Sequence, residues 1–422
     1  MSSTLTNPGS ADGAPSLENA TIVTSNWLGW AAFLGASWTW CIGMFLPVIL
    51  VRQYGFCGWV VFAVPNVIGA AAMGWVLRDA RSSDEIATVH RDACALFSGV
   101  TIAFHLFFVM AVVGPLALSV INKQDAMDLA VGVVFAASVL MYVYMTHRDG
   151  GDRVLAWFAL LISTVAMVFV VREISDIVAT TPERMRPMVM EFDSRLLGLA
   201  PVCVFGFAFC PYLDLTFHRA RQQTSGARAS FGVGFGVMFF TMIIFSLIYS
   251  RAFASDGVTG MIAIFLFVHM AVQTAFTVAA HARELLHRGQ IAGITAAVLT
   301  LASWIAYFFL PDHLLIKDLR AGEIIYRMFM GFYGLVFPAY VWLVMLPGRG
   351  RAKPTARSLA VFIVAVLIAT PMFWMGFIMQ QTIWLVPGLA VVLLSRVAVA
   401  RHQDFKRGCN GAFRRPNDAA LS

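Results

Sequence analysis

The chain is divided into twelve long blocks of mainly apolar residues, and most of its charged residues lie in the short segments between them. A helix of about 20 such residues crosses the roughly 30 Å hydrocarbon core of a bilayer. Only 13% of the 422 residues are charged and 59% are hydrophobic, which excludes a water-soluble globular domain. Blocks such as Ile291 to Leu310 lack the alternation typical of a membrane β-barrel strand. The sequence therefore predicts an all-α polytopic membrane protein.

The twelve predicted spans determine which connecting segments share a side of the membrane. Of the 30 lysines and arginines, 20 fall on the side of the two termini and 10 on the other side. By the positive-inside rule both termini face the cytoplasm, as in a multi-pass protein of a bacterial inner membrane. The net charge of +7 is spread over the ends of the blocks, so nucleic acid is not an expected partner. The predicted spans are 26–51, 55–79, 88–122, 127–147, 153–178, 194–219, 230–253, 258–286, 290–310, 322–346, 356–379 and 381–400.

The spacing of the spans indicates an internal repeat. Spans one to five cover 26–178 and spans six to ten cover 194–346, and each block is 153 residues long. Because five is an odd number, the second copy is inverted relative to the first. Inverted five-helix repeats followed by two further helices, here 356–400, are a known transporter plan, whereas a chance match of span lengths is the alternative. Residues 1–25 and 401–422 are expected to be cytoplasmic tails, the second of them basic.

The first span of each copy contains a weak point near its middle, where a transporter with this plan interrupts its helix. Gly35, Ser37 and Thr39 weaken span one because glycine is flexible and hydroxyl groups compete for backbone groups. In span six, Pro211 has no amide hydrogen, so the carbonyl of Phe207 loses its helical partner. Freed backbone groups can bind an ion or a polar solute; a simple kink or close helix packing is the alternative.

Aromatic side chains next to both weak points are candidates for the walls of a solute site. Trp38 and Trp40 lie in span one, and Phe207 and Phe209 lie in span six. Aromatic rings offer large, flat contact areas to organic solutes, although such residues also serve packing alone.

Asp214 is a candidate functional carboxylate because a charge inside the membrane is costly. It follows Pro211 by three residues, while His218 shares its helical face and Arg219 is close in sequence. Two interpretations stay open. Asp214 either lies inside the helix bundle, where it would bind solute or a proton, or lies at the cytoplasmic interface beside these basic residues.

Two further spans carry polar residues at helical spacing. His105 lies near the middle of span three, where it either binds solute or relays protons, or is a neutral histidine satisfied by a neighbouring helix. Span eight carries Gln273, and its Ala271 and Thr274 have the three-residue spacing that lets a carbonyl and a hydroxyl meet one small cation. The alternative for the hydroxyl is a hydrogen bond back into its own helix.

The sequence resembles transporters of the amino acid, polyamine and organocation superfamily, which have the LeuT-type fold, and is most similar to the sodium/solute symporter family. The resemblance rests on AFLGASWTWCIGMFLP from Ala32 to Pro47, on GFAFCP in span six and on AVQT in span eight. It implies a sodium site formed by the carbonyls of Gly35 and Trp38 and by Ala271 and Thr274. The sequence departs from the family pattern at Ala275, where a second hydroxyl is usual, so protons are an alternative coupling ion.

Together these features predict a secondary active transporter of a small organic solute, driven by Na⁺ or H⁺, and not an enzyme. No cofactor is expected other than Na⁺, and the expected partners are the solute and the lipid bilayer. A transporter-like sensor without transport is the first alternative, and an intramembrane enzyme with a haem held by His105 and His269 is the second. The predicted substrate-binding residues are Ser37, Trp38, Thr39, His105, Phe207, Phe209, Asp214 and Gln273.

Overall fold

The computed structural model describes residues 26–121, 125–181, 188–253, 258, 260–286, 290–310, 316, 319–348, 350 and 352–412. Within these residues the chain is almost entirely helical, and the only β interaction is one isolated bridge between Ile316 and Leu319. Eleven of the described helices are long and apolar enough to cross a membrane. The predicted all-α polytopic fold is confirmed. The predicted tail 1–25 lies outside the described residues.

One of these eleven helices belongs to two of the predicted spans: its first part completes the crossing that α1 begins, and its second part forms the next crossing. Helix α2 (Cys41–Val76) is 36 residues long and has a sharp kink at Gly55, where φ is 63°. The indole of Trp38, just before α2, donates a hydrogen bond of 2.7 Å to Asn66 in its second half. A continuous helix would separate residues so far apart in sequence by roughly 40 Å. The chain therefore turns back at Gly55, as the predicted spans 26–51 and 55–79 require.

Glycine is needed at this turn. The amide of Phe56 donates a hydrogen bond of 2.8 Å to the carbonyl of Val189, so the two backbones are in contact. A Cβ atom on Gly55 would lie 2.1 Å from the same carbonyl oxygen. The positive φ also disfavours any residue with a side chain.

The remaining helices follow in two groups that match the two predicted copies. The first group begins with α1 (Trp27–Trp38) and α2 and continues with α3 (Ala80–Val89), α4 (Arg91–Phe108), η2 (Val109–Val113), α5 (Gly114–Ile121), α6 (Asp125–His147) and α7 (Gly151–Thr180). The second group comprises α8 (Leu196–Phe209), η4 (Cys210–Leu213), α9 (Leu215–Gln223), α10 (Ala227–Val233), η5 (Gly234–Phe239), α11 (Phe240–Phe253), α12 (Gly260–Leu286), α13 (Gln290–Phe309), α14 (Ala321–Gly331), η6 (Phe332–Val336), α15 (Phe337–Tyr340), η7 (Val341–Met345) and η8 (Leu346–Gly348).

The contacts between helices follow the same pattern in both groups, as an internal repeat requires. Helix α1 packs against α7, α10 and η5, and its counterpart α8 packs against η6, α15 and α2. In the same way α6 packs against α12, while α13 packs against α4. Thus α1 and α8 each contact the fifth span of their own copy and the second span of the other copy. Likewise, the fourth span of each copy contacts the third span of the other. This pattern agrees with the predicted five-plus-five arrangement.

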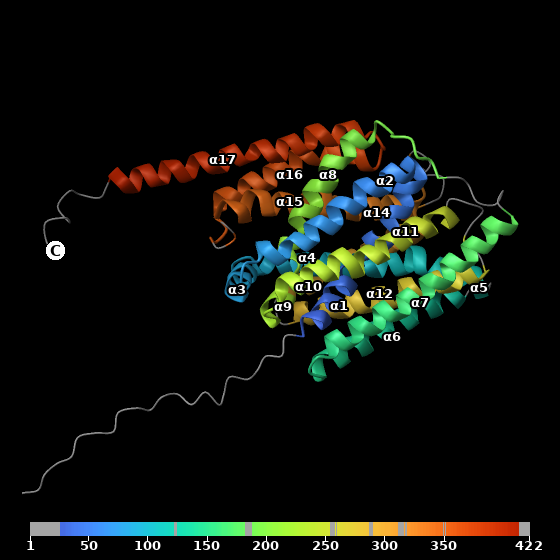
Figure 1. The fold of residues 1–422 in the computed structure, drawn as a ribbon. Coiled ribbons are helices and arrows are strands. Elements are labelled where there is room, and N and C mark those ends of the chain that lie inside the picture. Colours follow the sequence, from blue (N-terminus) through green and yellow to red (C-terminus); the bar gives the residue numbers. More distant parts are fainter. Residues whose placement is uncertain are drawn as a thin grey trace, which may run out of the picture.

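The last two long helices lie at one edge of the molecule. Helices α16 (Ala356–Phe377) and α17 (Leu385–Ala412) pack against each other after the short η9 (Thr382–Trp384), and Figure 1 shows them opposite the edge formed by α6 and α7. Both edges expose large apolar side chains, which suits contact with lipid. Helix α17 extends twelve residues beyond the predicted span end at residue 400. Examples of the exposed side chains are Leu140, Leu161, Leu367 and Leu394.

Candidate functional site

The first helical break separates α1 from α2. Helix α1 ends at Trp38 and α2 begins at Cys41, so Thr39 and Trp40 are not helical. Local groups satisfy part of the freed backbone: the Thr39 hydroxyl donates to the carbonyl of Gly35 at 2.8 Å, and the Trp40 amide donates to the carbonyl of Trp38 at 2.8 Å. The Trp40 indole donates to the carbonyl of Ser37. Thr39 therefore serves the backbone of the break in this geometry.

His105 supports the start of α2. Its Nε2 atom lies 3.2 Å from the amide nitrogen of Cys41, and its Nδ1 atom lies 2.7 Å from the carbonyl oxygen of Thr101. Because a carbonyl can only accept and an amide can only donate, the ring carries its proton on Nδ1 and is neutral. Both nitrogens are engaged, which favours the structural alternative for His105. It also leaves neither nitrogen with a lone pair for a haem iron.

The second break separates α8 from α9. Helix α8 ends at Phe209, the 3₁₀ segment η4 follows, and α9 begins after Asp214. Pro211 supplies no amide proton to the carbonyl of Phe207, as predicted from its chemistry. The backbone of Gly69 in α2 lies against this carbonyl, since a Cβ atom on Gly69 would be 2.2 Å from its oxygen.

A chain of hydrogen bonds joins the two breaks. The Oδ1 atom of Asp214 accepts hydrogen bonds of 2.7 Å from the amide and from the hydroxyl of Thr216. Asp214 thereby caps the N-terminus of α9. The Thr216 hydroxyl also lies 3.3 Å from the hydroxyl of Ser37 in the last turn of α1. All three side chains are fully buried. Asp214 therefore lies inside the protein, in contact with the first break.

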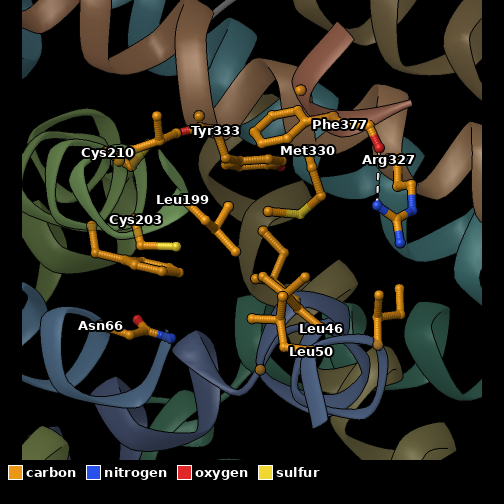
Figure 2. A pocket seen from close by; sticks show the side chains of 18 of the residues that line it. Leu46, Leu50, Asn66, Leu199, Cys203, Cys210, Arg327, Met330, Tyr333 and Phe377 are labelled. Atoms are coloured by element: carbon orange, nitrogen blue, oxygen red, sulfur yellow. Dashed lines mark hydrogen bonds between the residues drawn. The ribbon is translucent and has the colours of Figure 1, made fainter. Parts of the chain in front are cut away.

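A cavity of about 80 Å³ lies between the two breaks, which is enough for a few water molecules or part of a small solute. Both broken helices contribute to its wall, with α14, η6 and the end of α16 on the opposite side. Figure 2 shows apolar side chains from α2, α8 and α14 pointing into it and a few polar groups at its margin. The lining includes Trp38, Trp40, Leu46, Leu50, Asn66, Leu199, Cys203, Phe207, Cys210, Arg327, Met330, Tyr333 and Phe377.

Two tryptophans form one end of this cavity. The rings of Trp38 and Trp40 lie 4.3 Å apart between centroids. Trp40 also contacts the rings of Tyr333 at 5.7 Å and His281 at 5.5 Å. The indole nitrogen of Trp38 is held by Asn66, so its donor is satisfied and its ring is fixed. This wall is rigid, aromatic and nearly free of charge.

Ion pairs lie beside the cavity on the side where the first half of α2 ends. Glu323 of α14 pairs with Arg52 of α2, and it also pairs with Arg327 four residues further along its own helix at 2.7 Å. Arg327 donates a further hydrogen bond of 2.9 Å to the carbonyl of Phe377, marked in Figure 2. Arg327 is thus a cavity residue that is already paired with a carboxylate. We refer to Arg52, Glu323 and Arg327 as the first ion-pair layer.

A second ion-pair layer lies near Trp30, in the first turn of α1. Asp152 at the start of α7 accepts hydrogen bonds from Arg219 of α9 at 3.0 Å and from Arg283 of α12 at 3.3 Å. Arg219 also pairs with Glu284 at 3.3 Å, and its guanidinium lies 6.0 Å from the ring centre of Trp30 in α1. This layer, formed by Asp152, Arg219, Arg283 and Glu284, joins both broken helices to α7 and α12.

Helix α12 carries buried polar groups that are only partly satisfied. The amide nitrogen of Gln273 donates to the hydroxyl of Ser163 in α7 at 2.9 Å, whereas its Oε1 atom has no partner in the described part of the chain. The hydroxyls of Thr274 and Thr277 are likewise without a partner among the described residues. Ala271 is half-buried on the same helix. None of the four lines the cavity.

The structure separates the predicted substrate residues into two groups. Trp38 and Phe207 line the cavity. Phe209 lies outside the lining and contacts Trp342, with ring centroids 5.7 Å apart. The other predicted substrate residues also lie outside the lining, namely Ser37, Thr39, His105, Asp214 and Gln273.

Sequence reasoning missed several lining residues that come from other spans. Asn66 is an isolated amide in an otherwise apolar span, and that isolation is a signal that could have identified it. Arg327 is likewise a charged residue within a predicted span. Tyr333 carries no comparable signal, because a tyrosine within an apolar span also serves packing.

The chain matches no known family model, and no curated protein matches it. Two solved structures of a manganese transporter from Eremococcus coleocola are similar in fold. One, in complex with an aromatic bis-isothiourea substituted compound, is 11% identical with a TM-score of 0.45, and the other, of a mutant, is 10% identical with a TM-score of 0.44. Each comparison covers 93% of this chain and 97% of that chain. Values this low provide no residue-by-residue correspondence.

Proposed function

We propose that this chain is a secondary active transporter that moves a small organic solute by alternating access, with the cavity between the two breaks as the solute site. One observation carries the proposal: two helices in corresponding positions of the two copies are interrupted, and residues from both interruptions line one cavity. Interrupted helices are tolerated in lipid where they line a polar or ligand-filled space.

The wall of the cavity favours an uncharged organic solute. The tryptophan pair, Phe207 and Tyr333 supply flat apolar surfaces, and Asn66 supplies an amide. The one guanidinium in the lining belongs to the first ion-pair layer and is already paired with Glu323. Among the described residues, no three His, Cys, Asp or Glu side chains form a group that could hold a metal ion. This donor set suits a neutral ring or aliphatic body better than a manganese ion such as the neighbours' protein transports.

Sodium is the proposed coupling ion for a site between α1 and α12. The carbonyls of Gly35 and Trp38 lie at the end of α1, and the hydroxyl of Thr274 is buried without a partner in the described chain, as a group awaiting a cation would be. Both carbonyls already accept one hydrogen bond, but each has a second lone pair. Ala271 would add its carbonyl on the α12 side. Protons are the alternative coupling ion.

The two ion-pair layers supply the closures that alternating access needs. From the charge distribution we propose a bacterial inner membrane with both termini on the cytoplasmic side. In that orientation the first ion-pair layer faces outward and the second ion-pair layer faces the cytoplasm. Each layer joins a broken helix to the surrounding bundle. Breaking one layer while the other holds would open the cavity to one side at a time.

A thermal-shift screen of detergent-purified protein against amino acids, sugars, nucleobases and carboxylates, with sodium and pH varied, tests this function. A solute that binds the native state raises the unfolding temperature. The cavity variant Asn66→Leu should reduce the shift at a given solute concentration, whereas Phe209→Leu, in the second broken helix but outside the lining, should keep it. Thr274→Ala should abolish any sodium dependence of the shift. A shift that survives Asn66→Leu unchanged would contradict the proposed solute site.

A further inference from the structure

Asp214 has more acceptor capacity than its surroundings use. Its Oδ1 atom accepts both hydrogen bonds from Thr216, whereas its Oδ2 atom is buried and has no partner among the described residues. Capping α9 accounts for the first oxygen only, and Asn or Ser would cap a helix equally well. The second oxygen therefore remains unexplained by the fold.

No basic side chain in the described part of the chain forms an ion pair with this carboxylate. The nearby basic groups are already committed: Arg219 bonds Asp152 and Glu284, and His218 bonds Ser83 and the carbonyl of Tyr212. The titratable groups that face Asp214 from other elements are acidic or neutral, namely Glu284 of α12, Cys210 of η4 and Tyr333 of η6. The carboxylate thus lies in surroundings with no balancing positive charge.

The ends of two helices determine the local field at this point. Ser37 lies in the last turn of α1, where the backbone dipoles present roughly half a negative charge, and Asp214 precedes α9, whose N-terminus presents roughly half a positive charge. The two ends offset each other, so the carboxylate contributes a net charge of about −1. Leaving such a charge unbalanced inside a membrane protein is costly.

We infer that Asp214 binds one monovalent cation, H⁺ or Na⁺, at its Oδ2 atom, with the hydroxyls of Ser37 and Thr216 beside it, so that the cation holds the two helical breaks together. This inference rests on the proposed function, because a cation at this point would couple to solute only in a transporter. The site is distinct from the one proposed for Thr274 on α12. The proposed cation would lie beside the hydrogen bond between Thr216 of α9 and Ser37 of α1, which links the two broken helices.

The test uses purified full-length protein without any solute. The unfolding temperature is measured between about pH 5 and about pH 8, in NaCl and in choline chloride of equal ionic strength. If the cation is Na⁺, the wild type is stabilised by NaCl with a saturating dependence. If it is H⁺, the unfolding temperature falls as the pH rises, because the folded state binds the extra proton, and the two salts behave alike.

Asp214→Asn is the decisive variant, because it keeps the cap on α9 and removes the charge. In a Thr274→Ala background, which removes the sodium site proposed on α12, it should unfold at the same temperature in both salts and across the pH range. The matched control is Asp193→Asn: the pKa of Asp193 is already held low by a hydrogen bond from Arg195, and the variant should keep the wild-type sodium or pH dependence. The inference is overturned if Asp214→Asn retains that dependence or if the wild type shows neither.

A second variant decides the matter if Asp214→Asn does not fold. Thr216→Val keeps the backbone cap but removes the hydroxyl that bonds Oδ1. For Na⁺, the half-saturating concentration should rise about tenfold, since one ligand is lost. For H⁺, the transition should move to higher pH, since the ionised carboxylate loses a hydrogen bond. An unchanged midpoint in both titrations overturns the inference.

The outcomes separate this inference from the proposed function. A cation effect that disappears in Asp214→Asn while no solute binds would leave the cation site standing and remove the solute-transport proposal. Solute hits combined with an unchanged cation effect in Asp214→Asn would do the reverse. A sodium effect that Thr274→Ala abolishes and Asp214→Asn does not would assign the ion to α12 and overturn the inference.

Discussion

The Nε2 atom of His105 lies 3.2 Å from the amide nitrogen of Cys41, so a side chain of α4 caps the helix that restarts after the first break. Replacing His105 with Leu would leave this buried amide without an acceptor. We expect the unfolding free energy to fall by about 2 kcal/mol, the usual cost of an unsatisfied buried donor. Thermal or denaturant unfolding of the purified variant measures the change.

His147→Leu is the control for this variant. His147 lies exposed at the end of α6 and bonds to the carbonyl of Val143 in its own helix, so its replacement should change the unfolding free energy by less than about 0.5 kcal/mol. Equal effects of the two substitutions would show that the bond to Cys41 contributes nothing.

Because Trp38 and Asn66 are hydrogen-bonded, we expect the effects of replacing them on solute binding to be non-additive. Trp38→Phe removes the indole donor, and Asn66→Leu removes its acceptor. Each single variant should weaken solute binding about tenfold, since about 1.4 kcal/mol is lost by disturbing the cavity wall. The double variant should lose little more than either single one, because the second change removes a group that no longer has a partner. Strict additivity of the two binding energies would contradict this assignment.

Local chemistry explains which parts of the site could be predicted from the sequence. Pro211 lacks an amide proton wherever it occurs in a helix, so the freed carbonyl of Phe207 follows from the sequence alone. Phe209 is predicted beside Phe207 but lies outside the cavity lining, because residues two apart on a helix point in roughly opposite directions. The helix phase relative to the cavity depends on packing, which the apolar pattern of span six does not encode.

The partners of the buried polar groups depend on contacts between distant parts of the chain. His105 is completely buried, so it faces the interior of the protein. Its partner, the amide of Cys41, lies 64 residues away and becomes available only because α1 ends at Trp38. Tyr333 reaches the cavity in the same way, through packing of η6 against α8. Single-sequence periodicity contains no information on such pairings.

The first ion-pair layer predicts how access to the cavity is controlled. Glu323→Gln removes the carboxylate that Arg52 and Arg327 share. We expect the cavity to open more often, so that a maleimide reagent should label Cys203, which lines it, about tenfold faster, as loss of about 1.4 kcal/mol implies. The experiment uses a background in which the other five cysteines are replaced by alanine.

Arg52→Gln is the milder variant of the same layer, with which the labelling rate of Glu323→Gln is compared. The Arg52 side chain is half exposed, and its loss still leaves Glu323 paired with Arg327. The labelling rate of Cys203 should therefore rise much less than in Glu323→Gln. A larger effect of Arg52→Gln would place the main closure elsewhere.

The second ion-pair layer predicts a larger loss of stability. Asp152→Asn removes the negative charge that Arg219 and Arg283 share, and the Asp152 side chain is only 4% exposed. Removing one member of a buried charge group costs about 3 kcal/mol. Unfolding of the purified variant should show this loss, whereas Asp149→Asn, an exposed carboxylate three positions earlier in the chain, should leave the unfolding free energy almost unchanged.

The close approach of Gly69 to the carbonyl of Phe207 predicts that alanine is not tolerated at this position. A Cβ atom there would lie 2.2 Å from the carbonyl oxygen, and backbone cannot move aside as a flexible side chain can. Gly69→Ala should lower the unfolding free energy by about 3 kcal/mol and shift the second break away from α2. Gly132→Ala is the matched control, because a Cβ atom on Gly132 meets nothing within 4 Å and alanine favours the helix. Two glycines of one copy should thus respond in opposite directions, and a neutral Gly69→Ala would show that the freed carbonyl does not depend on this contact.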